Sequence, residues 1–142
     1  MKLFITFTKK TLIAVLAAVT AGLIIIGQLF TIRAGGIDGS TNAMRCEYVS
    51  GLGYSVDETA VSEKEIVVPE VFSDVYTKYN EIQKKAGFDL TLYKGKKAVV
   101  YTYRLNGEED TVINLIVSDK YIIGGDVSSV RIDGEMKPLS PA

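Results

Sequence analysis

The longest uncharged segment of the chain limits what it can fold into more than any other feature. It runs for twenty-two positions from Thr11 to Ile32. A helix needs about 20 apolar residues to cross the hydrocarbon core of a bilayer. The segment therefore predicts a membrane-spanning helix over residues 11–32, acting as a signal anchor with the lipid bilayer as its partner.

The charges beside this segment predict its orientation. Lys2, Lys9 and Lys10 precede it, whereas Arg33 alone follows it closely. Positively charged flanks remain in the cytoplasm. We therefore expect a single-pass protein of the cell membrane, with residues 1–10 in the cytoplasm and the remainder outside.

Two other interpretations of the segment stay open. A cleaved signal peptide has an apolar region of about 7–15 residues that ends at a small-x-small site. The apolar run here is longer, and Ile32-Arg33-Ala34 lacks the first small residue. A buried helix of a soluble domain is the third interpretation.

The rest of the chain predicts one small domain behind a short linker. Residues 33–39 are glycine-rich and predict a flexible linker. Residues 40–139 have the length of a single domain with a modest core, followed by a tail over 140–142. From Arg33 onward there are seventeen acidic and thirteen basic residues, a formal charge of −4. Such a domain has no general attraction for nucleic acid.

The absence of histidine narrows the possible chemistry. The chain has no histidine and one cysteine, Cys46. This excludes Ser-His-Asp and Cys-His catalysis and the HExxH zinc site. We expect Cys46 to pack as a small apolar residue, with an intermolecular disulfide and a catalytic thiol as alternatives. We predict no cofactor, no metal site and no enzymatic activity, although carboxylate-based hydrolysis needs no histidine.

Two helices are predicted in the domain. Residues 40–42 offer three capping side chains, and glycines at 51 and 53 end the first helix. The second helix begins at Pro69, which suits a first helical position, and ends at Gly87. Its side chains at three- and four-residue steps should pack on a sheet: Phe72, Val75, Tyr76, Tyr79, Ile82, Gln83 and Ala86.

Strand patterns occupy the second half of the domain. Residues 97–105, 111–117 and 121–127 are rich in β-branched and aromatic side chains, and a shorter strand is expected at 65–68. Turns at Asn106-Gly107 and at 118–120 make the long strands an antiparallel meander. The middle strand carries apolar residues in both alternating sets, so both of its faces should be covered.

These patterns together predict an α+β fold. We expect an N-terminal transmembrane helix and a small domain of two helices packed on a three- to four-stranded antiparallel sheet. Gly124-Gly125 predicts a bulge or a close backbone approach. The acidic cluster at 108–110 follows a turn and is interpreted as solvated, and residues 138–141 as a loose tail.

Several strings of the domain resemble the family DUF4830 over residues 40–139. They include Val67-Val68-Pro69-Glu70, Tyr79-Asn80, Gly87-Phe88-Asp89-Leu90 and Ile123-Gly124-Gly125-Asp126-Val127. The resemblance implies an N-terminal membrane segment and an origin in Gram-positive, mostly spore-forming bacteria, and it implies no activity. Ser128 stands where a cysteine is common in the family, so any role of that cysteine is absent here.

Four polar side chains form the candidate site. Asn80 and Gln83 lie on the second helix, Asp89 just after it, and Asp126 beside the paired glycines. They can meet where the helix crosses the sheet. One interpretation is structural, since buried backbone groups need partners. The others are a recognition pocket for a peptide or small ligand, and a metal site.

Two functional classes follow from these features. The first is a non-catalytic binding module at the bacterial cell envelope, whose partner is an envelope protein or a wall component. Exposed sheet edges that accept a partner strand would suit it. The alternative is a small extracytoplasmic hydrolase acting on cell-wall material, with two carboxylates roughly 5–10 Å apart and one raised pKa.

Overall fold

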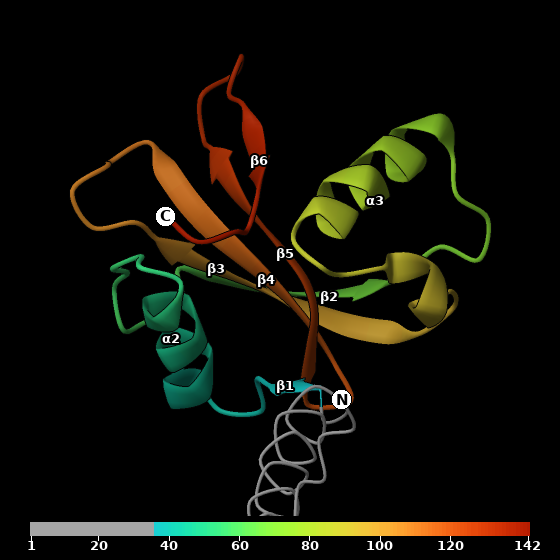
Figure 1. The fold of residues 1–142 in the computed structure, drawn as a ribbon, viewed down its shortest axis with the longest axis horizontal. Helices are drawn as coiled ribbons and strands as arrows, with labels where there is room; N and C mark the ends of the chain where they lie inside the picture. Colours follow the sequence, from blue (N-terminus) through green and yellow to red (C-terminus); the bar gives the residue numbers. More distant parts are fainter. Residues whose placement is uncertain (1–35) are drawn as a thin grey trace, which may run out of the picture. The chain divides into compact units, whose positions relative to one another are not determined.

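The structure, a computed structural model, describes residues 36–142. Its central feature is an antiparallel sheet of six strands (Figure 1). The strands are β1 (Ile37–Asp38), β2 (Ser62–Val67), β3 (Lys97–Arg104), β4 (Thr111–Ser118), β5 (Tyr121–Ser129) and β6 (Met136–Pro138). The other elements are α2 (Asn42–Gly51), α3 (Asp74–Lys85) and a short 3-10 helix, η1 (Leu90–Tyr93).

The α+β class is confirmed, and the predicted number of strands is wrong. The order along the sheet is β1-β5-β4-β3-β2, and β6 also pairs with β5. β1 and β6 lie against opposite ends of β5, at residues 121–122 and 126–128. Strands of two and three residues are too short to show an alternating pattern. Ile37 and Asp38, expected in the flexible linker, therefore belong to the sheet.

The two helices cover opposite faces of the sheet (Figure 1). α2 packs with one core cluster, formed by Val49, Tyr103, Ile113, Leu115, Val117, Ile122 and Leu139. α3 and η1 pack with a second cluster, formed by Val68, Leu90, Ala98, Ile116 and Ile123. The central strand β4 contributes to both clusters, so the prediction that both of its faces are covered is confirmed.

Each helix begins at a side-chain cap. The Thr41 hydroxyl accepts a hydrogen bond from the Met44 N–H at 3.2 Å at the start of α2. Ser73 does the same for Tyr76, also at 3.2 Å, so α3 begins at Asp74 and not at Pro69 as predicted. The stop at Gly87 is confirmed by its φ of +87°, which an L-residue adopts only with strain.

The apolar face of α3 is shorter than predicted. Tyr76, Tyr79 and Gln83 face the sheet, whereas Val75 is 78% exposed. Val75 and Tyr76 share the first turn of α3, and Tyr76 is the one that packs with the second core cluster.

The C-terminal segment is docked and is not the loose tail that was predicted. Leu139 is 1% exposed and belongs to the core beside α2. The Ala142 N–H donates to the Leu52 carbonyl at 2.9 Å, and the Tyr54 hydroxyl donates to the Ser140 carbonyl at 2.9 Å. Tail and domain therefore form one unit.

Within residues 36–142, no helix has the length and apolar character needed to cross a membrane. The predicted span over residues 11–32 lies outside the described residues.

Candidate functional site

The four predicted site residues lie along the seam between α3 and the sheet. The Asn80 amide donates to the Asp89 carboxylate at 3.0 Å and accepts from the Leu90 N–H at 2.8 Å. Asp89 also accepts from the backbone and hydroxyl of Thr91. Hydrogen bonds to the Asp89 carboxylate lower its pKa to about 2, from its ordinary 3.8. The bond from the Thr91 hydroxyl contributes most and the bond from Asn80 comes second. This pair fixes the path from α3 into η1.

Gln83 connects α3 to β5 at the paired glycines. Its side-chain oxygen accepts from the Gly125 N–H at 2.7 Å. An added Cβ at Gly124 would lie 2.9 Å from that oxygen, and one at Gly125 would lie 2.8 Å from the Asn114 carbonyl oxygen. The close approach predicted for these glycines is confirmed. The register also shifts opposite Ile116 and Val117, which confirms the bulge.

Asp126 lies in a buried network on the same face of the sheet. The carboxylate is 2% exposed and accepts from the Tyr79 hydroxyl at 2.9 Å, the Asn114 amide at 2.9 Å and the Ser128 hydroxyl. Burial raises the pKa of Tyr79, and the negative charge of Asp126 raises it further as the second cause. All of these donors are neutral, so the network fixes β4, β5 and α3 together without a cation.

The seam therefore joins the four residues in three separate sets and not in one open pocket. Asn80 bonds with Asp89, Gln83 with Gly125, and Asp126 with Tyr79 and its strand neighbours. Among the buried side-chain atoms of residues 36–142, Gln83 Nε2 alone has no partner. No group of three metal-ligating carboxylate or thiol side chains occurs in that part of the chain.

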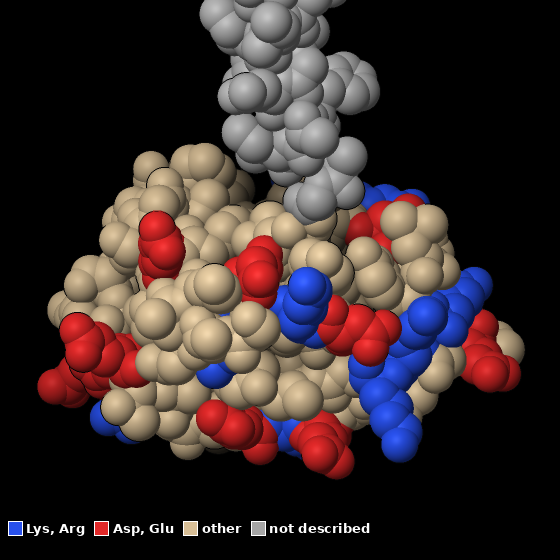
Figure 2. All heavy atoms as spheres, turned by 90° about the horizontal axis from the view of Figure 1, so that it is seen from below, with Lys and Arg blue, Asp and Glu red and all other residues tan. Residues whose placement is uncertain are grey.

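A groove of about 750 Å³ lies on the other face of the sheet, beyond the area that α2 covers. Its apolar lining comes from Val67, Val99, Tyr101 and Val117. Its charged lining comes from Glu65, Lys97, Asp119 and Lys120. The charges on the face drawn in Figure 2 are mixed in the same way, without a large area of one sign. This favours an amphipathic occupant over a polyanion.

Strand β2 borders this groove and has a free edge. Its only strand partner within residues 36–142 is β3. All of its residues except Ile66 are exposed, with Val67 58% exposed. An open strand edge beside a groove that can take alternate side chains is the arrangement that accepts an extended peptide as an additional strand.

A comparison with protein families gives one match. The profile described as "Domain of unknown function (DUF4830)" matches residues 48–127, more than half of the chain. The chain belongs to the DUF4830 family. No curated protein and no solved structure matches it. Asn80, Gln83, Asp89, Asp126 and strand β2 all lie within the matched part of this DUF4830 domain.

Sequence reasoning missed a buried arginine, Arg45, that stacks on the groove residue Tyr101. Arg45, on α2 of the DUF4830 domain, is 5% exposed, and its guanidinium carbon lies 3.5 Å from the centre of the Tyr101 ring. Its Nε donates to the Tyr103 hydroxyl and its Nη1 to the Gly39 carbonyl, each at 2.8 Å. The sequence feature that could have indicated its burial is its position four residues before Val49, which places both residues on the inward face of α2. Arg45 holds the groove residue Tyr101 in place.

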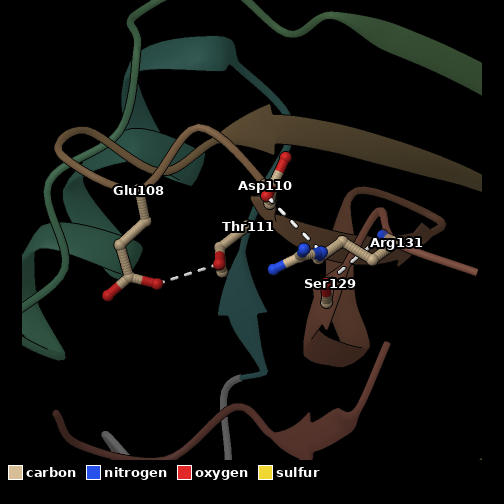
Figure 3. Close-up of polar contacts among 5 residues, drawn as sticks. All are labelled: Glu108, Asp110, Thr111, Ser129 and Arg131. Carbon is tan, nitrogen blue, oxygen red and sulfur yellow. Dashed lines mark hydrogen bonds and ion pairs between the residues drawn. The ribbon is translucent and has the colours of Figure 1, made fainter. Parts of the chain in front are cut away.

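The acidic cluster of the β3–β4 loop, residues 108–110, is exposed to solvent, as predicted. Figure 3 shows Glu108 accepting from the Thr111 hydroxyl at 2.8 Å, and Asp110 paired with Arg131 at 3.8 Å. The Arg131 and Asp110 side chains are 75% and 60% exposed, so their attraction is weak. Of these two contacts, the Asp110–Arg131 pair reaches the β5–β6 hairpin of the DUF4830 domain, where the Val130 N–H also donates to the Asp110 carbonyl at 2.8 Å.

Cys46 of the DUF4830 domain is a free thiol, partly buried beside the α2 core cluster. Burial raises its pKa, which lowers the fraction of nucleophilic thiolate. This fits the packing interpretation.

Proposed function

We propose that this protein is a non-catalytic interaction module, tethered by a single membrane span outside the bacterial cell membrane, that binds an extended segment of an envelope partner along β2. The observation that carries the proposal is the edge of β2, unpaired within residues 36–142, beside a groove whose lining is both apolar and charged. Strand addition uses main-chain hydrogen bonds for affinity and side-chain pockets for specificity.

The tether is supported by the sequence. The uncharged run from Thr11 to Ile32 has the length of a membrane span, and the lysines before it favour a cytoplasmic N-terminus. A tethered domain gains from binding partners in the same membrane or the adjacent wall, because the tether raises their effective concentration.

The hydrolase alternative finds no support at the seam. It requires two carboxylates in one cleft, one of them with a raised pKa. Asp126 is enclosed by its donors, and the pKa of Asp89 is lowered. The absence of enzymatic activity remains a prediction.

The proposal is tested by photo-crosslinking of the tagged full-length protein in cells. A photoreactive residue is placed at Glu63 or at Val67, two positions on the free edge. If a partner strand pairs with β2, the two positions crosslink to one partner segment, at residues about four apart and in a fixed order. Random collisions would scatter the crosslinks.

Two controls make this experiment decisive. A photoreactive residue at Glu109, in the exposed β3–β4 loop, should not reach that segment. Glu65→Pro removes an edge N–H and should abolish the ordered crosslinks. Scattered crosslinks, or the same products from an anchor lacking residues 40–142, would contradict strand addition.

A further inference from the structure

We propose that β2 selects a basic strand: an extended segment reading Val-x-Lys-x-Lys, with arginine acceptable for lysine, paired antiparallel to β2. This inference rests on the proposed function and names the chemistry of its partner. It follows from the register of β2, from the face its glutamates occupy, and from the charges that a second copy would bring.

The register decides which backbone groups are free. The Val68 N–H donates to the Lys96 carbonyl at 2.9 Å, on the β3 side. Because successive residues of a strand point their backbone groups to alternate sides, those of Glu63, Glu65 and Val67 point away from β3. A partner residue placed opposite each of these three positions forms the hydrogen-bonded pairs of the new ladder.

The same three residues place their side chains on the groove face. Glu63 is opposite Tyr101, Glu65 opposite Val99, and Val67 opposite Lys97. Cross-strand neighbours share a face, and both Glu65 and Val67 line the groove. The side chains that meet a partner strand on this face are therefore two carboxylates followed by an apolar residue.

Neither carboxylate is neutralised within the described part of the chain. The two ion pairs there join Arg131 to Asp110 and Lys137 to Glu135, both outside β2. Opposite charges on directly paired residues stabilise a sheet, and like charges destabilise it. Lysine or arginine opposite Glu63 and Glu65, and an apolar residue opposite Val67, complete the pattern.

A second copy of the chain does not satisfy this pattern. Antiparallel pairing of two β2 edges around Glu65 places the two Glu65 side chains opposite each other. Shifting the register by two residues places Glu63 opposite Glu65 of the other copy, and the two Lys64 side chains opposite each other. Both of these registers oppose like charges, a device by which exposed edges avoid self-pairing. The register shifted by two residues in the other direction places Val67 opposite Glu65, so none of the three places a lysine opposite Glu65.

The test uses the full chain in nonionic detergent and two labelled peptides. The first is Thr-Val-Val-Lys-Thr-Lys-Thr, and the second has glutamate in place of both lysines. Fluorescence anisotropy measures affinity, and hydrogen exchange with mass spectrometry shows whether β2 becomes protected. We expect the lysine peptide to bind on the order of tenfold more tightly, with a smaller difference at high salt.

Charge exchange provides the matched variants. The double variant Glu63→Lys/Glu65→Lys should reverse the preference and favour the glutamate peptide. The control Glu108→Lys/Glu109→Lys changes the net charge equally in the β3–β4 loop and should retain the preference for lysine. A reversal seen in both variants would mean that net charge, not the β2 register, selects the peptide, and would overturn the inference.

The remaining outcomes separate this inference from the proposed function. Equal binding of both peptides with protection of β2 overturns the basic preference and leaves strand addition intact. If neither peptide binds, the basic preference is also overturned. Strand addition itself is then tested by the order of the crosslinks from positions 63 and 67. Protection of β2 that grows with protein concentration, without peptide, would identify a second copy as the occupant.

Discussion

The side-chain oxygen of Gln83 on α3 accepts a hydrogen bond from the backbone N–H of Gly125 on β5 at 2.7 Å. This bond lies on the outer side of β5, in the interval between its pairings with β1 and β6. A helix side chain thus takes the place of a strand partner, since a buried N–H left without an acceptor is costly.

Gln83→Leu should therefore destabilise the domain by about 1–3 kcal/mol, the cost of an unsatisfied buried N–H group. Urea unfolding followed by circular dichroism measures the change. Lys85→Leu, at an exposed position on the same helix, is the control and should change stability little. Equal stability of the Gln83 variant and the wild type would mean that the bond contributes nothing.

Gly125 provides a second test, because other parts of the domain pack closely against its backbone. An added Cβ would lie 2.7 Å from Leu139 Cδ2 and 2.8 Å from the Asn114 carbonyl oxygen. Gly125→Ala should cost about 1–3 kcal/mol through overpacking. Gly51→Ala, with no atom within 4 Å of the new Cβ, should instead stabilise by about 0.5–1 kcal/mol at the end of α2. Thermal unfolding distinguishes the two directions.

The predictability of the fold depends on the length of each element. β3, β4 and β5 carry eight or nine residues each, enough for alternation to appear in the sequence. β1 and β6 have two and three residues and form only because β5 provides a partner. The start of α3 was misplaced because Pro69 fits a first turn, whereas the cap at Ser73 decides it.

The candidate site divides in the same way. Asn80, Gln83, Asp89 and Asp126 were selected as polar residues within the part of the chain that resembles the family, where buried backbone groups need partners. The partners of Gln83 and Asp126 depend on how α3 crosses the sheet, and no local sequence pattern determines that. Arg45 was missed because a charged residue on a short helix is expected to be exposed, and only the tyrosines on β3 give it a buried position.

Arg45 leads to the third prediction. Its two hydrogen bonds and its stacking on Tyr101 use the planar, forked shape of the guanidinium, which an ammonium group does not reproduce. Arg45→Lys should destabilise the domain by about 1–3 kcal/mol, because it leaves buried acceptors unsatisfied. Arg104→Lys, at an exposed position of β3, is the control. Urea unfolding that shifts equally in both variants would argue against a special role.

The tight turn between β4 and β5 gives the fourth prediction. Asp119 and Lys120 have φ values of +46° and +70°, the left-handed conformations of a two-residue hairpin turn. A glycine meets no Cβ clash there, whereas an L-residue is strained by about 1–2 kcal/mol. Lys120→Gly should stabilise by about 0.5–1 kcal/mol after the entropy of the unfolded glycine is subtracted. Lys120→Ala keeps the strain and should show no such gain in melting temperature.

Asp89 gives a prediction about pH. Hydrogen bonds from Thr91 and then Asn80 hold its pKa at about 2 in the folded state, against an ordinary 3.8. The unfolded chain therefore binds a proton at a higher pH than the folded chain does. The contribution of Asp89 to stability is present above pH 3.8 and is lost as the pH falls toward about 2. Asp89→Asn removes this contribution, so wild type and variant should differ most above pH 4 and converge near pH 2.

Thermal unfolding across this range measures the difference, with Asp133→Asn in the exposed β5–β6 hairpin as the control. A constant difference at every pH would show that the Asp89 hydrogen bonds do not distinguish the ionised from the neutral carboxyl.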